Sequence, residues 1–118
     1  MHNFKKLKIW IESMELVSES YKITRSFPKF ETYGLMSQMN RCAVSIPSNI
    51  SEGTSKNSNI HFAQYLEHSL GSAFEWETQL IVAHNEKYIS EEKFKELENK
   101  IKQIQKMISS FKSGLKKS

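Results

Sequence analysis

A chain of 118 residues, of which 38% are hydrophobic and 25% are charged, has room for a single domain around one hydrophobic core. Its longest unbroken apolar run, residues 80–83, is far too short to cross a membrane, and Glu12 interrupts the N-terminal region before any signal-type segment, so we expect a cytoplasmic protein that does not enter a membrane. The formal net charge of +4 is concentrated in residues 91–118, which hold eight lysines and four glutamates, and the single cysteine, Cys42, excludes an intramolecular disulfide.

The first predicted helix runs from about residue 7 to residue 25 and is ended by Pro28. Its apolar face is predicted from residues that recur at steps of four, three and four: Trp10, Met14, Val17 and Tyr21. An acidic stripe lies on the opposite side and consists of Glu12, Glu15 and Glu19. The segment therefore predicts an amphipathic helix with one face in the core.

The second predicted helix begins after Thr32, a suitable N-cap, and continues to about residue 52. Its apolar residues recur at helical spacing: Leu35, Met39, Cys42, Ile46 and Ile50. Pro47 lies inside this pattern, where it removes one backbone hydrogen bond and frees the carbonyl of Ala43, so we predict a kink near Ile46. The position of Cys42 on the apolar face favours a buried, unreactive thiol over a nucleophile.

A second, polar face runs along the same helix. It consists of Gln38, Arg41, Ser45, Asn49 and Glu52. A face that only meets solvent usually carries several lysines and glutamates, whereas this one places neutral side chains around a single arginine. We therefore favour a contact with another subunit, or a structural hydrogen-bond network, over a ligand site.

A small, polar loop is predicted at residues 53–59, with Gly53 ending the second helix in the left-handed conformation. The third predicted helix spans about residues 60–87, and one face of it carries Phe62, Leu66, Ser69, Ala73, Trp76 and Leu80. Gly71 is unfavourable inside a helix. Because small residues surround it, we predict that another helix approaches closely there.

The fourth predicted helix is capped by Ser90, and Glu91 and Glu92 are favourably placed at its positive end. Its apolar residues alternate at steps of three and four: Phe94, Leu97, Ile101, Ile104, Ile108, Phe111 and Leu115. Helices joined by short connections pack as antiparallel neighbours. The predicted fold is therefore an all-α, up-and-down four-helix bundle in which residues 1–118 form one domain.

Three segments carry a resemblance to a known family: Arg41-Cys-Ala-Val-Ser-Ile-Pro-Ser-Asn-Ile-Ser-Glu-Gly53, Phe27-Pro-Lys-Phe-Glu-Thr-Tyr-Gly-Leu35, and Gly71-Ser72 with Glu75 and Thr78-Gln-Leu80. With these segments the chain closely resembles the four-helix-bundle proteins encoded by intervening sequences in bacterial 23S rRNA genes, also called S23 ribosomal proteins. The resemblance implies a helical bundle that assembles into a homo-oligomeric ring, often a pentamer. It also implies a distant similarity to the accessory protein of diversity-generating retroelements, which works with a reverse transcriptase and nucleic acid.

Three positions depart from what the resembling proteins often carry. Lys56 stands in place of arginine, Trp76 in place of leucine, and Asn85-Glu-Lys87 where a Leu-Gly pair often precedes the tyrosine.

The sequence supports neither catalysis nor a cofactor. Glu-x-x-His pairs of the kind that hold di-metal centres in helical bundles are missing, as are a phosphate-binding glycine loop and any aspartate. His61 and His68 lie two turns apart without a carboxylate at matching spacing, and His84 is isolated, so we predict no metal site. The protein is therefore not expected to be an enzyme.

A lysine cluster in the last helix is the candidate nucleic-acid surface: Lys100, Lys102, Lys106, Lys112, Lys116 and Lys117. No acid follows Glu98, so these charges are not neutralised by sequence neighbours. A purely solubilising face explains the pattern equally well, because the helix dipole itself favours bases at this end. Any nucleic-acid binding here is expected to use phosphates rather than bases.

The leading interpretation is a non-enzymatic, homo-oligomeric bundle, expected to be a pentamer, that serves as an RNA-associated or adaptor module. Its partners are other copies of itself and an RNA or a nucleic-acid-processing protein. The alternatives are a protein-only assembly module whose charges serve solubility, and a bundle with an unrecognised ligand or metal site.

Overall fold

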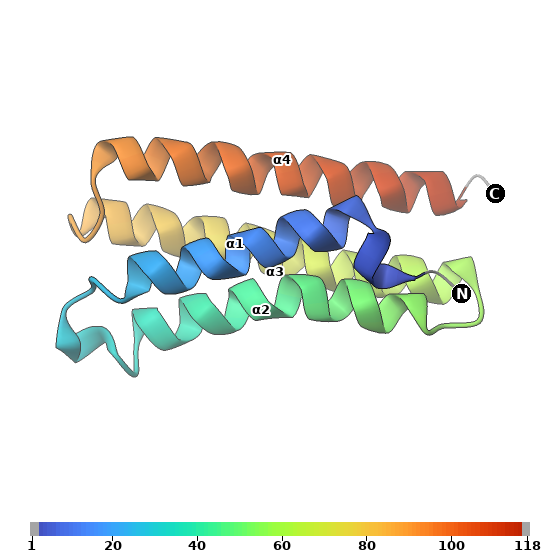
Figure 1. Cartoon of the computed structure of the whole chain (residues 1–118), viewed down its shortest axis with the longest axis horizontal. Coiled ribbons are helices and arrows are strands. Elements are labelled where there is room, and N and C mark those ends of the chain that lie inside the picture. The colour runs from blue at the N-terminus through green and yellow to red at the C-terminus, as the bar shows by residue number, and fades with distance from the viewer. Residues whose placement is uncertain (1–2, 117–118) are drawn as a thin grey trace.

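The computed structural model describes residues 3–116 of the chain, and side chains through residue 115. Its four α-helices are α1 (Lys8–Thr24), α2 (Leu35–Thr54), α3 (Asn59–Asn85) and α4 (Glu91–Lys116), with short 3-10 helices η1 (Phe4–Lys6) and η2 (Lys29–Glu31). The helices lie side by side and alternate in direction, in an elongated bundle of 46 × 24 × 20 Å (Figure 1). The all-α up-and-down bundle predicted from the sequence is confirmed.

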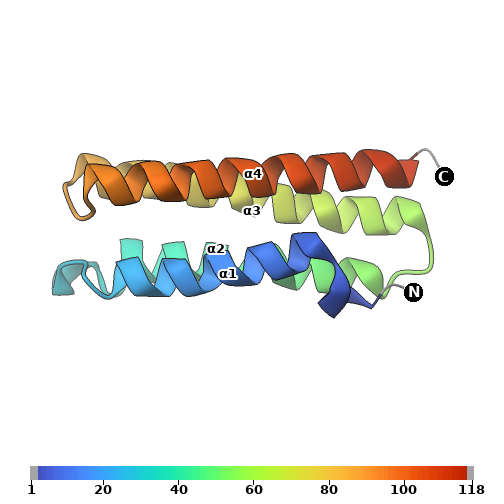
Figure 2. The same cartoon turned by 45° about the horizontal axis from the view of Figure 1, so that its top comes forward.

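The two ends of the bundle differ. The α1–α2 connection and the α3–α4 turn lie at one end, called the loop end below, and the α2–α3 connection lies at the other end with both chain termini (Figure 2). No helix within residues 3–116 combines the length and the apolarity that a membrane crossing requires.

The core faces of α2, α3 and α4 are those that the periodicity predicts. The buried apolar residues of these helices include Met39, Cys42, Ile46, Ile50, Phe62, Leu66, Ala73, Trp76, Leu80, Leu97, Ile101, Ile104 and Ile108. Leu35, Phe94, Phe111 and Leu115, at the ends of the predicted faces, are only partly buried against this core. The 3.6-residue pattern therefore identifies the inward side of three helices out of four.

The predicted face of α1 is wrong by about one residue. Its buried line is Ile9, Ser13, Leu16, Ser20 and Ile23, whereas Met14 and Tyr21 are each 41% exposed. The reason is that two serines lie in the core with their hydroxyl groups bonded: Ser13 Oγ donates to the carbonyl of Ile9, and Ser20 joins a network described next. Trp10 and Val17 are partly buried at the side of the helix instead. With Met14 they border an apolar hollow of about 260 Å³ against Val44 and Pro47 of α2.

A buried polar network joins α1, α2 and α3 at the centre of the bundle. Ser20 Oγ donates to Asn40 Oδ1 at 2.9 Å, and Asn40 Nδ2 donates to Thr24 Oγ1 at 3.0 Å. Trp76, which has no exposed surface, donates from Nε1 to Ser20 Oγ at 3.0 Å. The buried polar atoms satisfy one another, so their burial does not leave an uncompensated desolvation penalty.

The N-terminus of α2 is capped by a different residue from the one predicted. Thr32 lies in the preceding connection, Gly34 takes the N-cap position, and the carboxylate of Glu31 accepts from the backbone N–H of Leu35 at 3.0 Å. A carboxylate suits this place because the first turn of a helix presents unbonded N–H groups and a positive dipole end.

Gly53 has a different role from the predicted left-handed helix end. No glycine in the described chain has a positive φ, and α2 continues through Gly53 to Thr54. A Cβ at Gly53 would lie 2.8 Å from Cδ1 of Phe62, closer than carbon atoms approach. Glycine is therefore required here because the ring of Phe62 lies against the α2 backbone.

The prediction for Gly71 is wrong within the single chain. Gly71 faces outward, and a Cβ added to it would meet nothing within 4 Å. The close approach of α2 and α3 involves neighbouring residues instead: Ser69 is buried and donates to the carbonyl of Ile46 at 2.8 Å. The carbonyl of Ile46 that accepts this bond lies one residue before Pro47, and α2 runs through the proline as one helix. The kink predicted near Ile46 stays a prediction.

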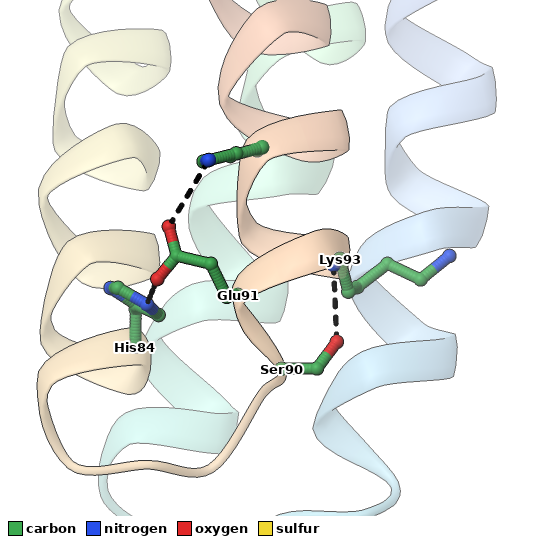
Figure 3. A network of polar contacts seen from close by, with 5 residues as sticks. His84, Ser90, Glu91 and Lys93 are labelled. Carbon is green, nitrogen blue, oxygen red and sulfur yellow. Dashed lines mark hydrogen bonds and ion pairs between the residues drawn. The ribbon is translucent and has the colours of Figure 1, made fainter.

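The α3–α4 turn is closed by defined polar contacts (Figure 3). Ser90 caps α4 as predicted, since its Oγ accepts from the backbone N–H of Lys93 at 3.1 Å. Glu91 Oε2 lies 2.8 Å from His84 Nε2, and the imidazole stacks on Phe94 with ring centroids 4.1 Å apart. Together these contacts fix the start of α4 against the end of α3.

Lys87 ends α3 in the left-handed conformation, with φ of 65°. The backbone N–H of Lys87 donates to the carbonyl of His84, and that of Tyr88 donates to the carbonyl of Ala83, which is the Schellman arrangement. A lysine thus occupies a left-handed position that glycine usually takes at the end of a helix.

Candidate functional site

The polar face of α2 borders a groove that it shares with α3. One part of the groove, of about 250 Å³, is lined by Gln38, Arg41, Cys42, Ser45, Ser72, Glu75 and Gln79. A wider part, of about 510 Å³, is lined by Ser45, Asn49, Glu67, His68, Gly71, Ser72 and Glu75. Because Ser45, Ser72 and Glu75 border both parts, we treat them as one surface and call it the polar groove.

Two serines close the middle of the polar groove. Ser45 Oγ of α2 and Ser72 Oγ of α3 lie 2.9 Å apart, at hydrogen-bond distance. Asn49 Nδ2 donates to the carbonyl of Ser45 at 2.9 Å and to its Oγ at 3.0 Å. The Ser45–Ser72 bond links α2 to α3, and the Asn49 bonds, which lie within α2, fix the position of Ser45.

Other polar groups of the groove lack partners. Gln79 Oε1 is buried without a hydrogen bond, and exchange of its amide oxygen and nitrogen would leave the nitrogen in the same position. Among the described residues, neither Arg41 nor Glu75 has an oppositely charged group within 4.0 Å. A buried, unbonded polar atom is unfavourable, so Gln79 is a locally destabilising feature of the groove.

The groove also contains one face of Cys42. Burial raises the pKa of this thiol, and the nearby carboxylate of Glu75 raises it further. A raised pKa keeps the sulfur protonated, and only the thiolate is a strong nucleophile. The predicted burial of Cys42 is confirmed, and the environment does not activate the sulfur.

The residues predicted on α2 are only partly brought together. Gln38, Arg41, Ser45 and Asn49 line the groove, and Gly71 borders its wider part. Glu52 is exposed and does not line the groove, and Arg41 is exposed as well, so the buried Arg41–Glu52 network considered from the sequence does not exist in the chain. Arg41 and Glu52 are eleven residues apart on one helix, which separates them by about 16 Å along the helix axis.

The residues that complete the groove come from α3, and the sequence reading did not assign them a role. Ser72, Glu75 and Gln79 follow one another at steps of three and four along α3. The same helical spacing that identified the polar face of α2 identifies this second polar face. The spacing alone does not show which two helix faces pack against each other.

Of the four predicted lysines whose side chains are described, two are paired with acids of other helices. Lys100 Nζ lies 2.9 Å from Glu15 Oε2 and 3.7 Å from Glu12 Oε2, so it joins α4 to the acidic stripe of α1. Lys112 Nζ lies 3.5 Å from Glu67 of α3. Both lysines are therefore neutralised inside the bundle.

Of the other four predicted lysines, two are exposed and two have side chains outside the described residues. Lys102 is exposed, with Glu98 at 3.9 Å, and Lys106 is exposed without an ion pair among the described side chains. The side chain of Lys116 and the whole of Lys117 lie outside the described residues. Among the described side chains, Lys102 and Lys106 are thus the members of the candidate phosphate-binding surface that lie on the outer side of α4.

The Glu15–Lys100 contact shifts the pKa of both groups. The hydrogen bond and the charge of Lys100 hold the pKa of Glu15 below its usual value. Partial burial alone would lower the pKa of Lys100, but the hydrogen bond from Lys100 to Glu15 and the charges of Glu15 and Glu12 raise it overall. Both shifts favour the charged pair at neutral pH.

No group of three or more His, Cys, Asp or Glu side chains in residues 3–116 is arranged to hold a metal ion. His61 Nδ1 lies 3.0 Å from Ser58 Oγ at the start of α3, and the His68 ring packs edge-on against Tyr65. With His84 engaged at the α3–α4 turn, three of the histidines have local structural contacts.

Comparison with known proteins supports one assignment. Residues 5–110 match the model of the 23S rRNA-intervening sequence protein family. A crystal structure of a protein of unknown function from the S23 ribosomal protein family of Bacteroides thetaiotaomicron superposes with a TM-score of 0.81, at 23% identity, over 87% of this chain and 96% of that chain. At that identity the similarity shows the fold alone. A search of curated proteins gives no match. Because the family model covers nearly the whole chain, the protein belongs to the 23S rRNA-intervening sequence protein family.

Proposed function

We propose that the protein is a non-enzymatic bundle that assembles with further copies of itself, and that the polar groove is a contact surface of this assembly. The observation that carries the proposal is the groove itself, in which the exposed charges of Arg41 and Glu75 have no oppositely charged group within 4.0 Å among the described residues. A partner that covers the groove supplies counter-charges to both.

A second copy suits this role because the groove carries charges of both signs. Arg41 and Glu75 of one copy can each meet an opposite charge on another copy, and few charges lie between them. Neutral amide and hydroxyl groups at the centre of a contact, with charges at its margin, are typical of protein interfaces. The family resemblance adds the expectation of a closed ring of five subunits.

Light scattering coupled to gel filtration tests this assembly. We expect a mass near 69 kDa at micromolar concentration, five times the 13.8 kDa of one chain. Glu75→Arg places two cations in the groove and is expected to shift the mass toward 13.8 kDa, because like charges then oppose the contact. Glu92→Arg, at an exposed glutamate outside the groove, is the matched control and is expected to keep the wild-type mass.

Circular dichroism establishes that both variants are folded. A wild-type monomer would contradict the assembly itself. A Glu75→Arg variant that assembles as well as the wild type would show that the contact lies elsewhere on the bundle.

A second candidate function is association with RNA through the outer side of α4. It is favoured by the exposed, weakly paired Lys102 and Lys106 and by the absence of acids after Glu98 in the sequence. Lysines on one side of a helix attract phosphates without reading bases, and a ring repeats them once per subunit.

Changing Lys102 and Lys106 to glutamine is expected to weaken binding to duplex RNA and to lower the slope of log K against log salt. Each lost phosphate contact lowers this slope by close to one unit on a duplex, as calibrated for DNA. Fluorescence titration at several salt concentrations measures it, with Lys5→Gln/Lys6→Gln, two exposed lysines of η1, as the control. If the wild type binds no RNA at low salt, the protein-only assembly module is the function that remains.

A further inference from the structure

The two most exposed aromatic side chains of the described chain lie together at the loop end. Tyr33 is 95% exposed and Phe30 is 78% exposed, and both belong to the connection between α1 and α2 (Figure 1). Neither takes part in the core or in the polar groove. We call Phe30 and Tyr33, with the flanking cations Arg25 and Lys29, the aromatic tip.

The segment that carries these rings is fixed by several bonds. Glu31, between the two aromatic residues, accepts from the Leu35 N–H through Oε1 at 3.0 Å and from the Tyr88 hydroxyl through Oε2 at 2.9 Å. The backbone N–H of Gly34 donates to the carbonyl of Glu31 at 3.0 Å. Phe27, which is buried, anchors the start of the segment against the Tyr88 ring, with centroids 5.3 Å apart. The rings are therefore held outward by an ordered connection, which reduces the entropy lost on binding.

Positive charge surrounds the rings. Lys22, Arg25, Lys29 and Lys87 are exposed at or near the loop end, and none has an ion pair within the described chain. Among the acids nearby, Glu31 is already bonded to Leu35 and Tyr88, while Glu86 is exposed. The connection that carries the rings thus places two cations without ion pairs, Arg25 and Lys29, beside them, while Glu19, Glu91 and Glu92 lie on the neighbouring helices at the same end.

A hollow of about 300 Å³ adjoins the tip. It lies between α1 and the α3–α4 turn, and it is lined by Glu19, Lys22, Ile23, Ser26, Tyr88, Ile89, Ser90 and Lys93. Tyr88 connects the hollow to the tip, because its ring lies against Phe30 with centroids 6.5 Å apart. Its lining is mixed in charge, with Lys22 beside Glu19 and with Lys93 already paired with Glu96, so the hollow offers donors and acceptors for a polar group.

From this arrangement we infer that the aromatic tip binds single-stranded nucleic acid, with bases stacked on Phe30 and Tyr33 and phosphates held by Arg25 and Lys29. Rings in contact with solvent offer faces to bases that are not already stacked in a duplex, and every base has such a face, so no base sequence is selected. Arg25 and Lys29, which have no ion pair within the described chain, are placed beside the rings to meet the phosphates of such a strand. The inference deepens the RNA-binding candidate proposed above, since it names the kind of strand and the residues that hold it.

Fluorescence anisotropy with a labelled single-stranded RNA of about ten nucleotides tests the inference. Phe30→Ser/Tyr33→Ser is expected to weaken binding by roughly 5- to 150-fold for each base that loses its stacking partner. Binding to a duplex of the same sequence is expected to change little. Single-stranded DNA is expected to behave as the RNA does, because nothing in the tip is placed to read the 2′-hydroxyl.

Three variants separate stacking from other effects. Phe30→Tyr/Tyr33→Phe keeps both rings and is expected to keep the wild-type affinity. Ile60→Ser removes a side chain that is 74% exposed at the opposite end of the bundle and is expected to leave binding unchanged. Arg25→Gln/Lys29→Gln is expected to lower the salt slope by about 0.7 for each lost phosphate contact.

The outcomes distinguish this inference from the broader proposal. If the wild type binds no RNA of either kind, association with RNA fails altogether. If it binds single strands and Phe30→Ser/Tyr33→Ser binds them equally well, the tip is not the site and the exposed rings belong to a contact with protein. Loss of duplex and single-strand binding together in that variant would also contradict stacking.

Discussion

Trp76→Ala is expected to lower the free energy of unfolding by about 3 to 5 kcal/mol, the range measured for buried tryptophan and phenylalanine. Trp76 has no exposed surface, and its Nε1 donates to Ser20 Oγ, so the substitution leaves both a cavity and a weakened polar network. Guanidinium denaturation followed by circular dichroism measures the loss. Few single changes in this chain remove more buried surface.

Two other substitutions locate the origin of that loss. Trp76→Phe keeps an aromatic ring but removes the N–H donor and part of the buried indole, so we expect a loss between the roughly 1 kcal/mol of the hydrogen bond alone and that of Trp76→Ala. Trp10→Ala removes a tryptophan that is only partly buried, so a smaller loss than for Trp76→Ala is expected. Equal losses at Trp10 and Trp76 would contradict the central position of Trp76 in the core.

Gly53→Ala and Gly71→Ala are expected to change stability in opposite directions. At Gly53 the new methyl group meets the Phe62 ring at 2.8 Å and Tyr65 Cβ at 3.0 Å, so overpacking destabilises by about 1 to 3 kcal/mol. At Gly71 the methyl group meets nothing within 4 Å, and the higher helix propensity of alanine stabilises by up to about 1 kcal/mol. Thermal and chemical denaturation of both variants provide the comparison.

The pair also bears on assembly. Gly71 borders the polar groove, so a Gly71→Ala variant that is more stable as a single bundle yet lighter by light scattering would place the subunit contact over Gly71. Stabilisation by Gly53→Ala, in contrast, would mean that Phe62 moves aside at little cost and that the tight contact with α2 is absent.

The sequence predicted the bundle because three of its helices follow the simple rule that apolar residues recur at the core. In α1 the rule failed at Ser13 and Ser20, which a hydrophobicity pattern assigns to solvent. Ser13 is satisfied within α1 by the carbonyl of Ile9. Ser20 is satisfied by Asn40 of α2 and Trp76 of α3, and a pattern within one helix contains no information about partners on another.

Only the α2 side of the candidate site was predicted. Arg41, Ser45 and Asn49 were found from the polar spacing of α2, but Ser72, Glu75 and Gln79 became part of the site only when the packing of α2 on α3 was known. Two of the predicted lysines are paired within the chain for a related reason. Counting lysines along α4 ignores direction, and Lys100 and Lys112 lie at the two sides of the core face, where acids of α1 and α3 meet them.

The two bonds of Glu31 have a consequence for local unfolding. One carboxylate holds both the first turn of α2 and the hydroxyl of Tyr88, which belongs to the α3–α4 turn 57 residues away in the chain. Neither connection can open without releasing the other, so the two form one cooperative unit in the sense used for hydrogen exchange. The amide of Leu35 and the ring of Tyr88 would then become mobile in the same opening event, and any ligand held by Phe30 and Tyr33 would slow both.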